Sequence, residues 1–395
     1  MPATPSTRQT TPLRIVVIGG GITGAAAAAE LAREGHAVTL IEKQRIAAMA
    51  SGWTLGGVRQ SGRHPAELPL ARAAVAIWGR LAATLGVDVE YRQSGNLRLA
   101  RNPAEVNVIR ALVEEQRALG LPLHFLSGND AVRAVAPAIS RIVLAASFCP
   151  TDGHANPVKA TRAFAQLARS HGAAIREGVA ALAITVNGDR VTGVDSSAGF
   201  IAADRVIVAA GVDTPGLLSS IGADLPLSIQ IVHVVQSEPL PLRLVPAFGV
   251  ANADCAGRQE VDGRLRFTSG GRDWPGDASV WTERALAPSA AEVRSVVERV
   301  GHVLPMAAEA PVARTWGGLI DLTPDALPVI DAPERLFGVV IAAGFSGHGF
   351  CLGPLSGLLC ADLAVGRVPR HDLSAFTLAR FARHTATPAA LTLHG

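Results

Sequence analysis

A glycine-rich turn near the start of the chain has the spacing that binds a nucleotide pyrophosphate. Gly19, Gly21 and Gly24 form a G-x-G-x-x-G motif between a strand-like apolar run and an alanine-rich helical run. The first glycine permits a tight turn, the second lets a pyrophosphate approach the backbone, and the third allows close packing of helix on strand. Ile22 and Thr23 open the helix, whose N-terminus favours the phosphates. The motif therefore predicts a dinucleotide site.

An acidic residue follows this turn at the position expected for a ribose contact. Glu42 lies 18 residues beyond Gly24, at the end of the second predicted strand, and Lys43 comes next. A carboxylate there accepts hydrogen bonds from ribose hydroxyls and repels a 2′-phosphate. The pattern thus favours FAD or NAD over NADP.

Glycine-rich segments far from this motif favour FAD, because a flavin ring and its ribityl arm need further contacts. Three segments qualify: Ser51-Gly52 through Gly56, Gly57 and Val58; Ala210-Gly211; and Gly344 through Gly347, His348, Gly349 and Phe350. The last joins a strand to a helix, so its amides can face the flavin N1–C2=O edge, which becomes negative on reduction.

Several side chains near these segments are candidates for binding or oxidising a substrate. Arg59 can hold a carboxylate with two hydrogen bonds, and Arg63 is a second choice. His348 can contact the flavin or tune the protonation of an amine. Arg314 and Trp316 lie on a predicted substrate-domain strand. A structural role remains the alternative for each.

The coarse pattern along the chain predicts two interleaved domains. Helices are expected at 22–33, 65–85, 103–119, 157–170, 289–303 and 353–365, and strands at 14–18, 37–41, 89–93, 96–101, 180–186, 190–194, 205–209 and 338–342. Residues 225–280 are strand-rich, and segments 89–93 and 96–101 are expected to pair antiparallel. The FAD-binding domain is assigned to 13–85, 150–222 and 335–372, the substrate domain to 86–149 and 223–334, and terminal segments to 1–12 and 373–395.

Composition excludes several classes of protein. The chain has 395 residues and is 49% hydrophobic, yet no apolar run is long enough to cross a bilayer. Basic residues outnumber acidic ones by 36 to 33 without a cluster that would suggest nucleic acid. The four cysteines lack metal-ligand spacing, so no metal is expected, and residues 1–12 lack the apolar core of a secretory signal. We expect a cytoplasmic protein.

The chain resembles the FAD-dependent D-amino-acid oxidase superfamily, and within it the β subunits of sarcosine oxidase and of related imino-acid and opine dehydrogenases. The resemblance is carried by Val17–Glu42, Gly52–Arg59, Thr151–His154, Thr315–Leu319, Thr323–Asp325 and Gly344–Pro354. It implies an α/β FAD-binding Rossmann-like domain interleaved with an α+β substrate domain built on an antiparallel sheet. It also implies that Val179 meets the adenine, and that the reaction is hydride loss from the carbon alpha to an amine, giving an imine that water hydrolyses.

Departures from the family pattern narrow the expected reaction. Cys351 stands where monomeric sarcosine oxidases carry a substrate-binding lysine, so it is expected to contact the substrate. Gly318 stands near the cysteine that attaches their FAD, so FAD is expected to be non-covalent. Ile320 replaces an arginine common in glycine and D-amino-acid oxidases. The only lysines, Lys43 and Lys159, do not suit an oxygen-assisting role.

These departures favour a dehydrogenase over an oxidase. The expected substrate is an amino or imino acid, most of all a secondary amine such as a proline-like, N-methyl or opine compound, with electrons passing to a partner subunit or carrier. The alternatives are a stand-alone oxidase that produces hydrogen peroxide, a hydroxy-acid enzyme, and a non-catalytic flavin-binding subunit.

His154 corresponds roughly to a histidine that carries covalent FMN in heterotetrameric relatives, and Arg266 lies where related oxidases have an oxygen-assisting lysine.

Overall fold

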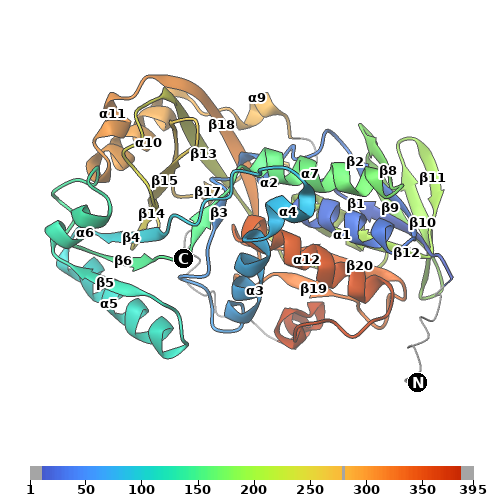
Figure 1. The fold of residues 1–395 in the computed structure, drawn as a ribbon. Coiled ribbons are helices and arrows are strands. Elements are labelled where there is room, and N and C mark those ends of the chain that lie inside the picture. The colour runs from blue at the N-terminus through green and yellow to red at the C-terminus, as the bar shows by residue number, and fades with distance from the viewer. Residues whose placement is uncertain (1–10, 278–280, 384–395) are drawn as a thin grey trace.

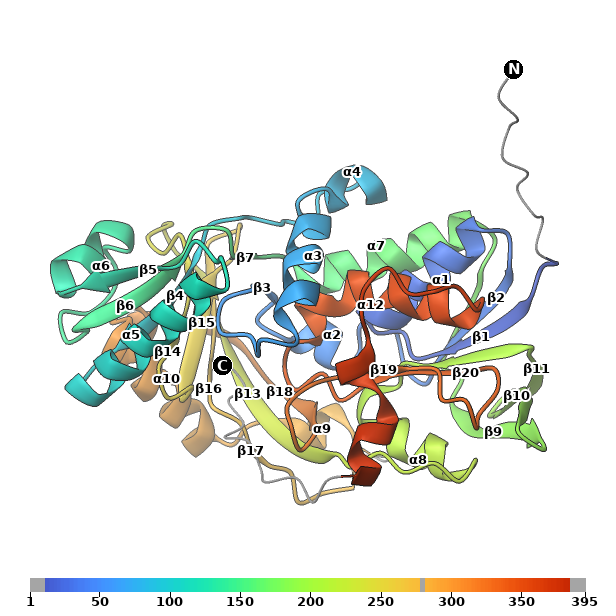
Figure 2. The same cartoon turned by 90° about the horizontal axis from the view of Figure 1, so that it is seen from below.

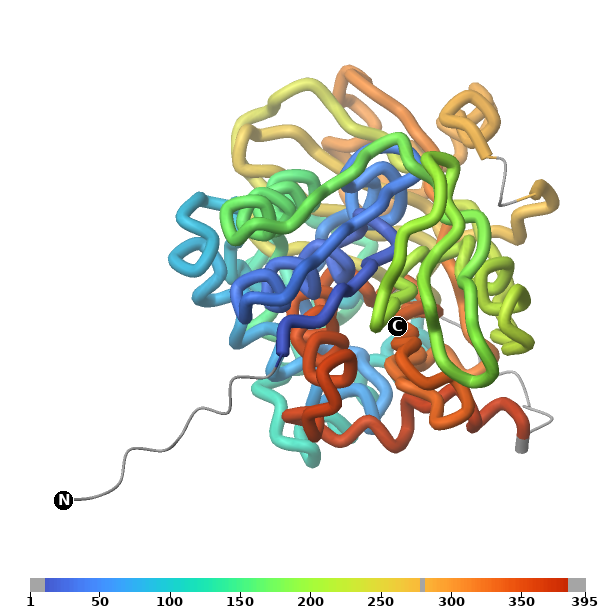
Figure 3. Tube along the Cα trace, turned by 90° about the vertical axis from the view of Figure 1, so that its right-hand side faces the viewer, coloured from blue at the N-terminus to red at the C-terminus, as the bar shows by residue number. Residues whose placement is uncertain are grey.

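Two large sheets standing side by side divide the molecule into two halves (Figure 1). The computed structural model describes residues 11–277 and 281–383. The half on the right of Figure 1 contains elements from both ends of the chain, and Figure 3 shows its blue N-terminal strands and red C-terminal segments in the same half. The other half is built from the middle of the chain, so the chain passes between the halves more than once.

The first sheet is predominantly parallel. Within the described residues it has six strands in the order β19-β20-β12-β1-β2-β8, and every pair except β19 with β20 is parallel. The strands are β1 (Arg14–Ile18), β2 (Ala37–Glu42), β8 (Ala174–Glu177), β12 (Arg205–Val208), β19 (Val329–Asp331) and β20 (Val339–Ala343). β1 lies centrally, so the turn that follows it is at the carboxyl edge of the sheet, where α/β proteins bind nucleotides.

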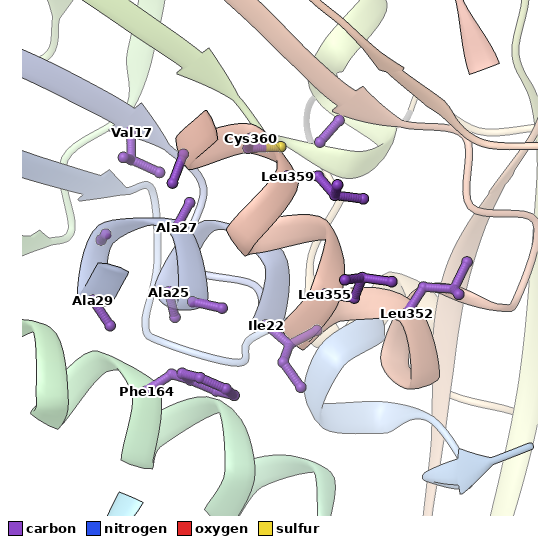
Figure 4. Close-up of a cluster of buried hydrophobic side chains, with 14 of the residues drawn as sticks. Val17, Ile22, Ala25, Ala27, Ala29, Phe164, Leu352, Leu355, Leu359 and Cys360 are labelled. Atoms are coloured by element: carbon purple, nitrogen blue, oxygen red, sulfur yellow. The ribbon is translucent and has the colours of Figure 1, made fainter. Parts of the chain in front are cut away.

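Three helices cover one face of this sheet: α1 (Ile22–Arg33), α7 (Pro157–Ser170) and α12 (Gly349–Ala364). Figure 4 shows α1 and α12 crossing closely, with Ile22 beside Leu355 of α12. A Cβ added to Gly357 would lie 2.5 Å from Cβ of Ala26, so the helices approach more closely than a larger residue permits. The other face is covered by β9 (Ala181–Asn187), β10 (Arg190–Ser196), β11 (Gly199–Ala202) and α8 (Thr214–Ser219).

The second sheet is mostly antiparallel and runs in the order β17-β13-β16-β15-β14-β4-β6-β5, with β18 also pairing β13; β14 and β4 are its parallel pair. Its strands are β4 (Asn96–Ala100), β5 (His124–Ser127), β6 (Ala145–Cys149), β13 (Ser228–Pro239), β14 (Ala247–Val250), β15 (Cys255–Gln259), β16 (Arg264–Ser269), β17 (Arg272–Asp273) and β18 (Val312–Leu322).

Alternation along these strands decides what each face of the second sheet contacts. Leu97, Leu99, Phe248 and Phe267 point to the far face, where α6 and α10 complete an apolar core. Figure 2 shows the second sheet beside the half that contains the parallel sheet. The near face, which is turned toward that half, carries Arg98, Gly249 and Ala256. Helices of this half are α5 (Pro103–Ala118), α6 (Asn129–Val135), α9 (Glu283–Leu286), α10 (Ala290–Val303) and α11 (Met306–Glu309).

Short elements join the two halves. They are α2 (Ala50–Trp53), α3 (Leu68–Trp78), α4 (Leu81–Leu85), and the two-stranded pair β3 (Gly57–Val58) with β7 (Gly153–His154). No helix among the described residues is long and apolar enough to cross a membrane.

The predicted fold class is confirmed: a parallel FAD-type sheet with an antiparallel substrate-type sheet. Three local predictions are wrong. The helix expected at 65–85 is two helices broken at Gly79 and Arg80, where the backbone NH groups bond back to the preceding turn and α3 ends. Segment 89–93 forms no strand: Arg92 makes an isolated bridge with His154, and β4 pairs with β6 and β14 instead. α12 starts at Gly349, four residues before the predicted start, and contains Pro354.

The domain boundaries predicted from sequence remain a prediction. β19 lies in the parallel sheet although its residues precede position 335. Val179 lies in the loop between β8 and β9.

Candidate active site

A cavity of about 870 Å³ lies between the two halves. One end is formed by the G-x-G-x-x-G turn, and the other by the near face of the second sheet. Predicted site residues that line it are Gly19, Gly21, Ile22, Thr23, Glu42, Lys43, Ser51, Gly57, Arg59, Val179, Ala210, Gly211, Gly347, Gly349 and Phe350. One continuous space therefore connects the nucleotide motif with the candidate substrate residues.

The nucleotide end is shaped by glycines that no other residue could replace without movement. Gly19 has φ +110°, and a Cβ there would lie 2.2 Å from the carbonyl oxygen of Ala209. A Cβ on Gly24 would lie 2.1 Å from the carbonyl oxygen of Gly19, which fixes the close packing of α1 against the turn. Ser51 Oγ accepts from the amide of Ile22 at 2.9 Å, so the α2 segment is tied to the start of α1.

Glu42 reaches the turn from the end of β2. Its Oε2 accepts from the amide of Gly20 at 2.7 Å and its Oε1 from the amide of Gln44 at 2.8 Å. Burial raises the pKa of Glu42, while these amides oppose the shift. Lys43 Nζ lies 2.7 Å from Asp213, next to Gly211. The carboxylate is thus held at the cavity wall where a ribose would lie.

The loop containing Gly56 and Gly57 is held by Arg258, a residue that also lines the cavity and that sequence reasoning missed. Arg258 donates to the carbonyl of Leu55 and, at 3.3 Å, to the carbonyl of Ala155. Its Nη1 lies 3.0 Å from Nδ1 of His154, whose pKa burial lowers to about 3. His154 is therefore a neutral, buried partner of Arg258 and does not line the cavity.

The loop at 344–347 is anchored by Asp321 at the end of β18. Asp321 Oδ2 accepts from the amide of Gly344 at 2.7 Å, and its carbonyl accepts from the amide of Ser346 at 2.9 Å. Burial raises the pKa of Asp321 to about 6. The loop leads into the N-terminus of α12, where Gly349 and Phe350 line the cavity, and a helix N-terminus favours anions.

The opposite end of the cavity is lined by Arg59, Arg63 and Arg98. Burial, with repulsion from Arg63, holds the pKa of Arg59 well below its usual range and lowers that of Arg98 to about 10. Asp152 attracts both groups, while its own oxygens accept from the amide of Gln60 at 2.8 Å and from Ser61. This end remains cationic at neutral pH.

His348 points away from the cavity. Its Nδ1 lies 3.0 Å from Oε2 of Glu67 on the turn before α3, and burial lowers its pKa to about 4. Although burial opposes ionisation, His348 and Arg63 lower the pKa of Glu67 to about 2. Within the described part of the chain, His348 Nε2, Glu67 Oε1 and Arg63 Nη1 are buried without a hydrogen-bond partner. The geometry places His348 behind the flavin-type loop rather than in contact with a substrate.

Three residues predicted to bind substrate also lie outside the lining of the cavity. Cys351 is buried, with its thiol 3.4 Å from the carbonyl of Arg59, because α12 turns that side chain toward the helix packing. Trp316 donates to the carbonyl of Trp53 at 3.1 Å, and the guanidinium carbons of Arg266 and Arg314 each lie 5.2 Å from the centre of its ring. Arg314 is exposed on the surface. Some residues of the predicted glycine-rich segments do not line the cavity themselves and belong to the backbone next to the lining residues. They are Gly24, Gly52, Gly56, Val58 and Gly344.

The residues present fit FAD. A pyrophosphate needs the open approach at Gly21, an adenosine needs Glu42, and a flavin ring needs the glycine-rich walls at Gly57 and Gly347; one cavity contains all of them. Within the described residues, no group of three or more His, Cys, Asp or Glu side chains is arranged to hold a metal ion.

Comparison with known proteins supports this interpretation. The chain is 29% identical over 397 residues to 4-methylaminobutanoate oxidase (formaldehyde-forming) of Paenarthrobacter nicotinovorans, covering 95% of this chain but 46% of that relative. The structure of glycine oxidase from Bacillus cereus superposes with a TM-score of 0.83 at 30% identity, covering 93% of this chain and 98% of the other. L-proline dehydrogenase from P. horikoshii superposes with a TM-score of 0.84 at 28% identity, covering 94% and 98%.

The sequence profile of one family matches residues 14–363, which is most of the chain. That family and the solved relative at 30% identity agree with the geometry of the cavity and with FAD as the cofactor. The chain belongs to the DAO family of FAD-dependent oxidoreductases.

Proposed function

We propose that this protein oxidises the C–N bond of an amino or imino acid, preferring a secondary amine such as a proline-like, N-methyl or opine compound. The observation that carries the proposal is that Arg59 and Arg98 line the same cavity as the glycine-rich loops that contain Gly57 and Gly347. A guanidinium binds a carboxylate with two parallel hydrogen bonds, so these arginines can fix an amino acid with its alpha carbon toward the cofactor.

The chain's own residues have a limited task in this reaction. FAD, when bound, accepts the hydride from the alpha carbon. Arg59 holds the carboxylate, while the apolar walls at Val232 and Leu319 exclude water from the reacting carbon. No histidine is found among the described residues that line the cavity, so the substrate amine has to arrive neutral or lose its proton to solvent. The imine product is hydrolysed by water.

The names of two relatives support a secondary amine. Both 4-methylaminobutanoate and L-proline contain a carboxylate and a nitrogen bonded to two carbons. Ile320 lies in the cavity wall, where an apolar side chain suits an alkyl substituent better than a charged group. These points favour a substituted amine over glycine.

We infer that a dehydrogenase reaction, with electrons passed to a partner subunit or carrier, is favoured over direct reaction with oxygen. Among the described residues that line the cavity, Lys43 is the only lysine. Its ion pair with Asp213 holds it at the nucleotide end, away from the place where a lysine would assist the reaction of a flavin with oxygen. A stand-alone oxidase is the second candidate, which the glycine oxidase relative favours by its name.

The test is an anaerobic titration of the purified flavoprotein with a panel of amines. We expect bleaching of the flavin band by a carboxylate-bearing secondary amine, and slow reoxidation in air without stoichiometric hydrogen peroxide. Arg294, exposed on α10, provides a matched control: Arg294→Met should leave the titration unchanged, whereas Arg59→Met should shift it. Rapid oxygen turnover with stoichiometric peroxide would instead establish the oxidase.

A further inference from the structure

The near face of the second sheet presents two groups of arginines on either side of a floor of small residues. Arg98 on β4 lies opposite Gly249 on β14, which lies opposite Ala256 on β15. Arg258 stands two residues beyond Ala256, so it shares this face. Since β4 and β15 are two strand spacings apart, the backbones of the two arginines are separated by roughly 10 Å or more across the sheet. The small side chains leave a hollow between the two groups.

The first group has one positive charge in excess. Arg59, Arg63 and Arg98 carry three positive charges, and the acids packed among them are Glu67 and Asp152. Glu67 pairs with Arg63 at 3.5 Å and with His348, which is neutral because burial lowers its pKa to about 4. One substrate carboxylate would balance this group.

The second group also has one positive charge in excess. Arg258 and Arg266 share a single carboxylate oxygen, Oε1 of Glu260, at 3.2 and 3.1 Å. The next acids outward are already paired, Glu90 with Lys159 and Asp262 with Arg264. His154 beside Arg258 is neutral and adds no charge. Both arginines are buried, so water screens the excess charge poorly.

We propose that the substrate carries two carboxylates, as in an amino dicarboxylic acid or an amine bearing an N-carboxyalkyl group. One carboxylate binds at Arg59 and Arg98, and the second lies over the floor toward Arg258 and Arg266. A substrate with one carboxylate leaves a buried positive charge uncompensated, and that selects against it. This inference rests on the proposed function, since it names the substrate of the same cavity.

The experiment compares two ligands that have five carbons and no amine, so that binding is measured without oxidation. Glutarate and pentanoate are titrated into the FAD-bound protein, and Kd is read from the perturbation of the flavin spectrum. We expect glutarate to bind at least about tenfold more tightly than pentanoate. Equal affinity, tighter pentanoate binding, or no perturbation by either ligand would overturn the inference.

Variants locate the second carboxylate. Arg266→Met should weaken glutarate and leave pentanoate unchanged, while Arg266→Lys, which keeps the charge, should retain the preference. Arg294→Met on exposed α10 is the control and should bind both ligands as the unaltered protein does. A glutarate preference that survives Arg266→Met would contradict the proposed position.

The amine panel separates this inference from the proposed function. Bleaching by monocarboxylic secondary amines, with no advantage for dicarboxylic ones, would sink the inference and leave the proposed function intact. Tight glutarate binding in a protein that no amine reduces would sink the proposed function, whereas the two-carboxylate binding site would stand.

Discussion

Replacing Asp321 by asparagine removes a carboxyl group that the fold holds in the cavity wall, where burial raises its pKa from 3.8 to about 6. Asparagine keeps an oxygen to accept from the amide of Gly344. A carboxyl with a raised folded pKa costs stability once it ionises, and this cost grows as pH rises from the unfolded value through the folded value. The shift in pKa corresponds to a loss of roughly 3 kcal/mol in the free energy of unfolding at high pH. About 2 kcal/mol of this loss occurs between pH 4.5 and pH 8.

The assay is urea unfolding of the two proteins at several pH values, with FAD in the same excess throughout. We compare the free energy of unfolding of Asp321→Asn with that of the unaltered protein at each pH. The variant's value minus the unaltered protein's value should increase by about 2 kcal/mol between pH 4.5 and pH 8. Asp195→Asn, at an exposed position, is the control and should show no such trend. A difference that stays constant over this pH range would refute the burial argument.

Three other substitutions or reactions test separate parts of the structure. Arg59→Met should raise the amine concentration needed for half-maximal bleaching by about tenfold or more, and an unchanged concentration would remove Arg59 from the carboxylate role. Gly357→Leu should lower the free energy of unfolding by about 1–3 kcal/mol in urea titrations, because its side chain meets Ala26 at the α1–α12 crossing; unaltered stability would contradict that packing. Cys351, whose pKa burial raises to about 11, should resist iodoacetamide at pH 8 until the protein unfolds, as mass spectrometry can show; rapid labelling of the folded protein would count against its burial.

The nucleotide end could be predicted from sequence because its determinants are local. Strand, turn and helix follow one another within Arg14–Arg33, and Glu42 comes at the end of the next strand. The same holds for α7, where Asn156 caps the helix by accepting from the amide of Lys159. Each of these features depends on neighbours in the chain, which a single sequence shows directly.

The substrate end could not be predicted to the same extent, because it depends on register between strands distant in the chain. Arg98 and Arg258 share one face only because β14 pairs in parallel with β4 and antiparallel with β15. A signal was present, since Arg98 stands between Leu97 and Leu99, and Arg258 follows Cys255, Ala256 and Gly257. His348 was misplaced for a related reason: its partner Glu67 lies 281 positions away.

The central claim is that this chain uses FAD to oxidise the C–N bond of a carboxylate-bearing amine. The most direct measurement is the visible spectrum of the purified protein during anaerobic titration with such amines. We predict a bound flavin whose band bleaches on addition of an amino or imino acid, at a concentration that Arg59→Met raises. A flavin that binds but that no amine in the panel reduces would contradict the claim and indicate a non-catalytic flavin-binding subunit.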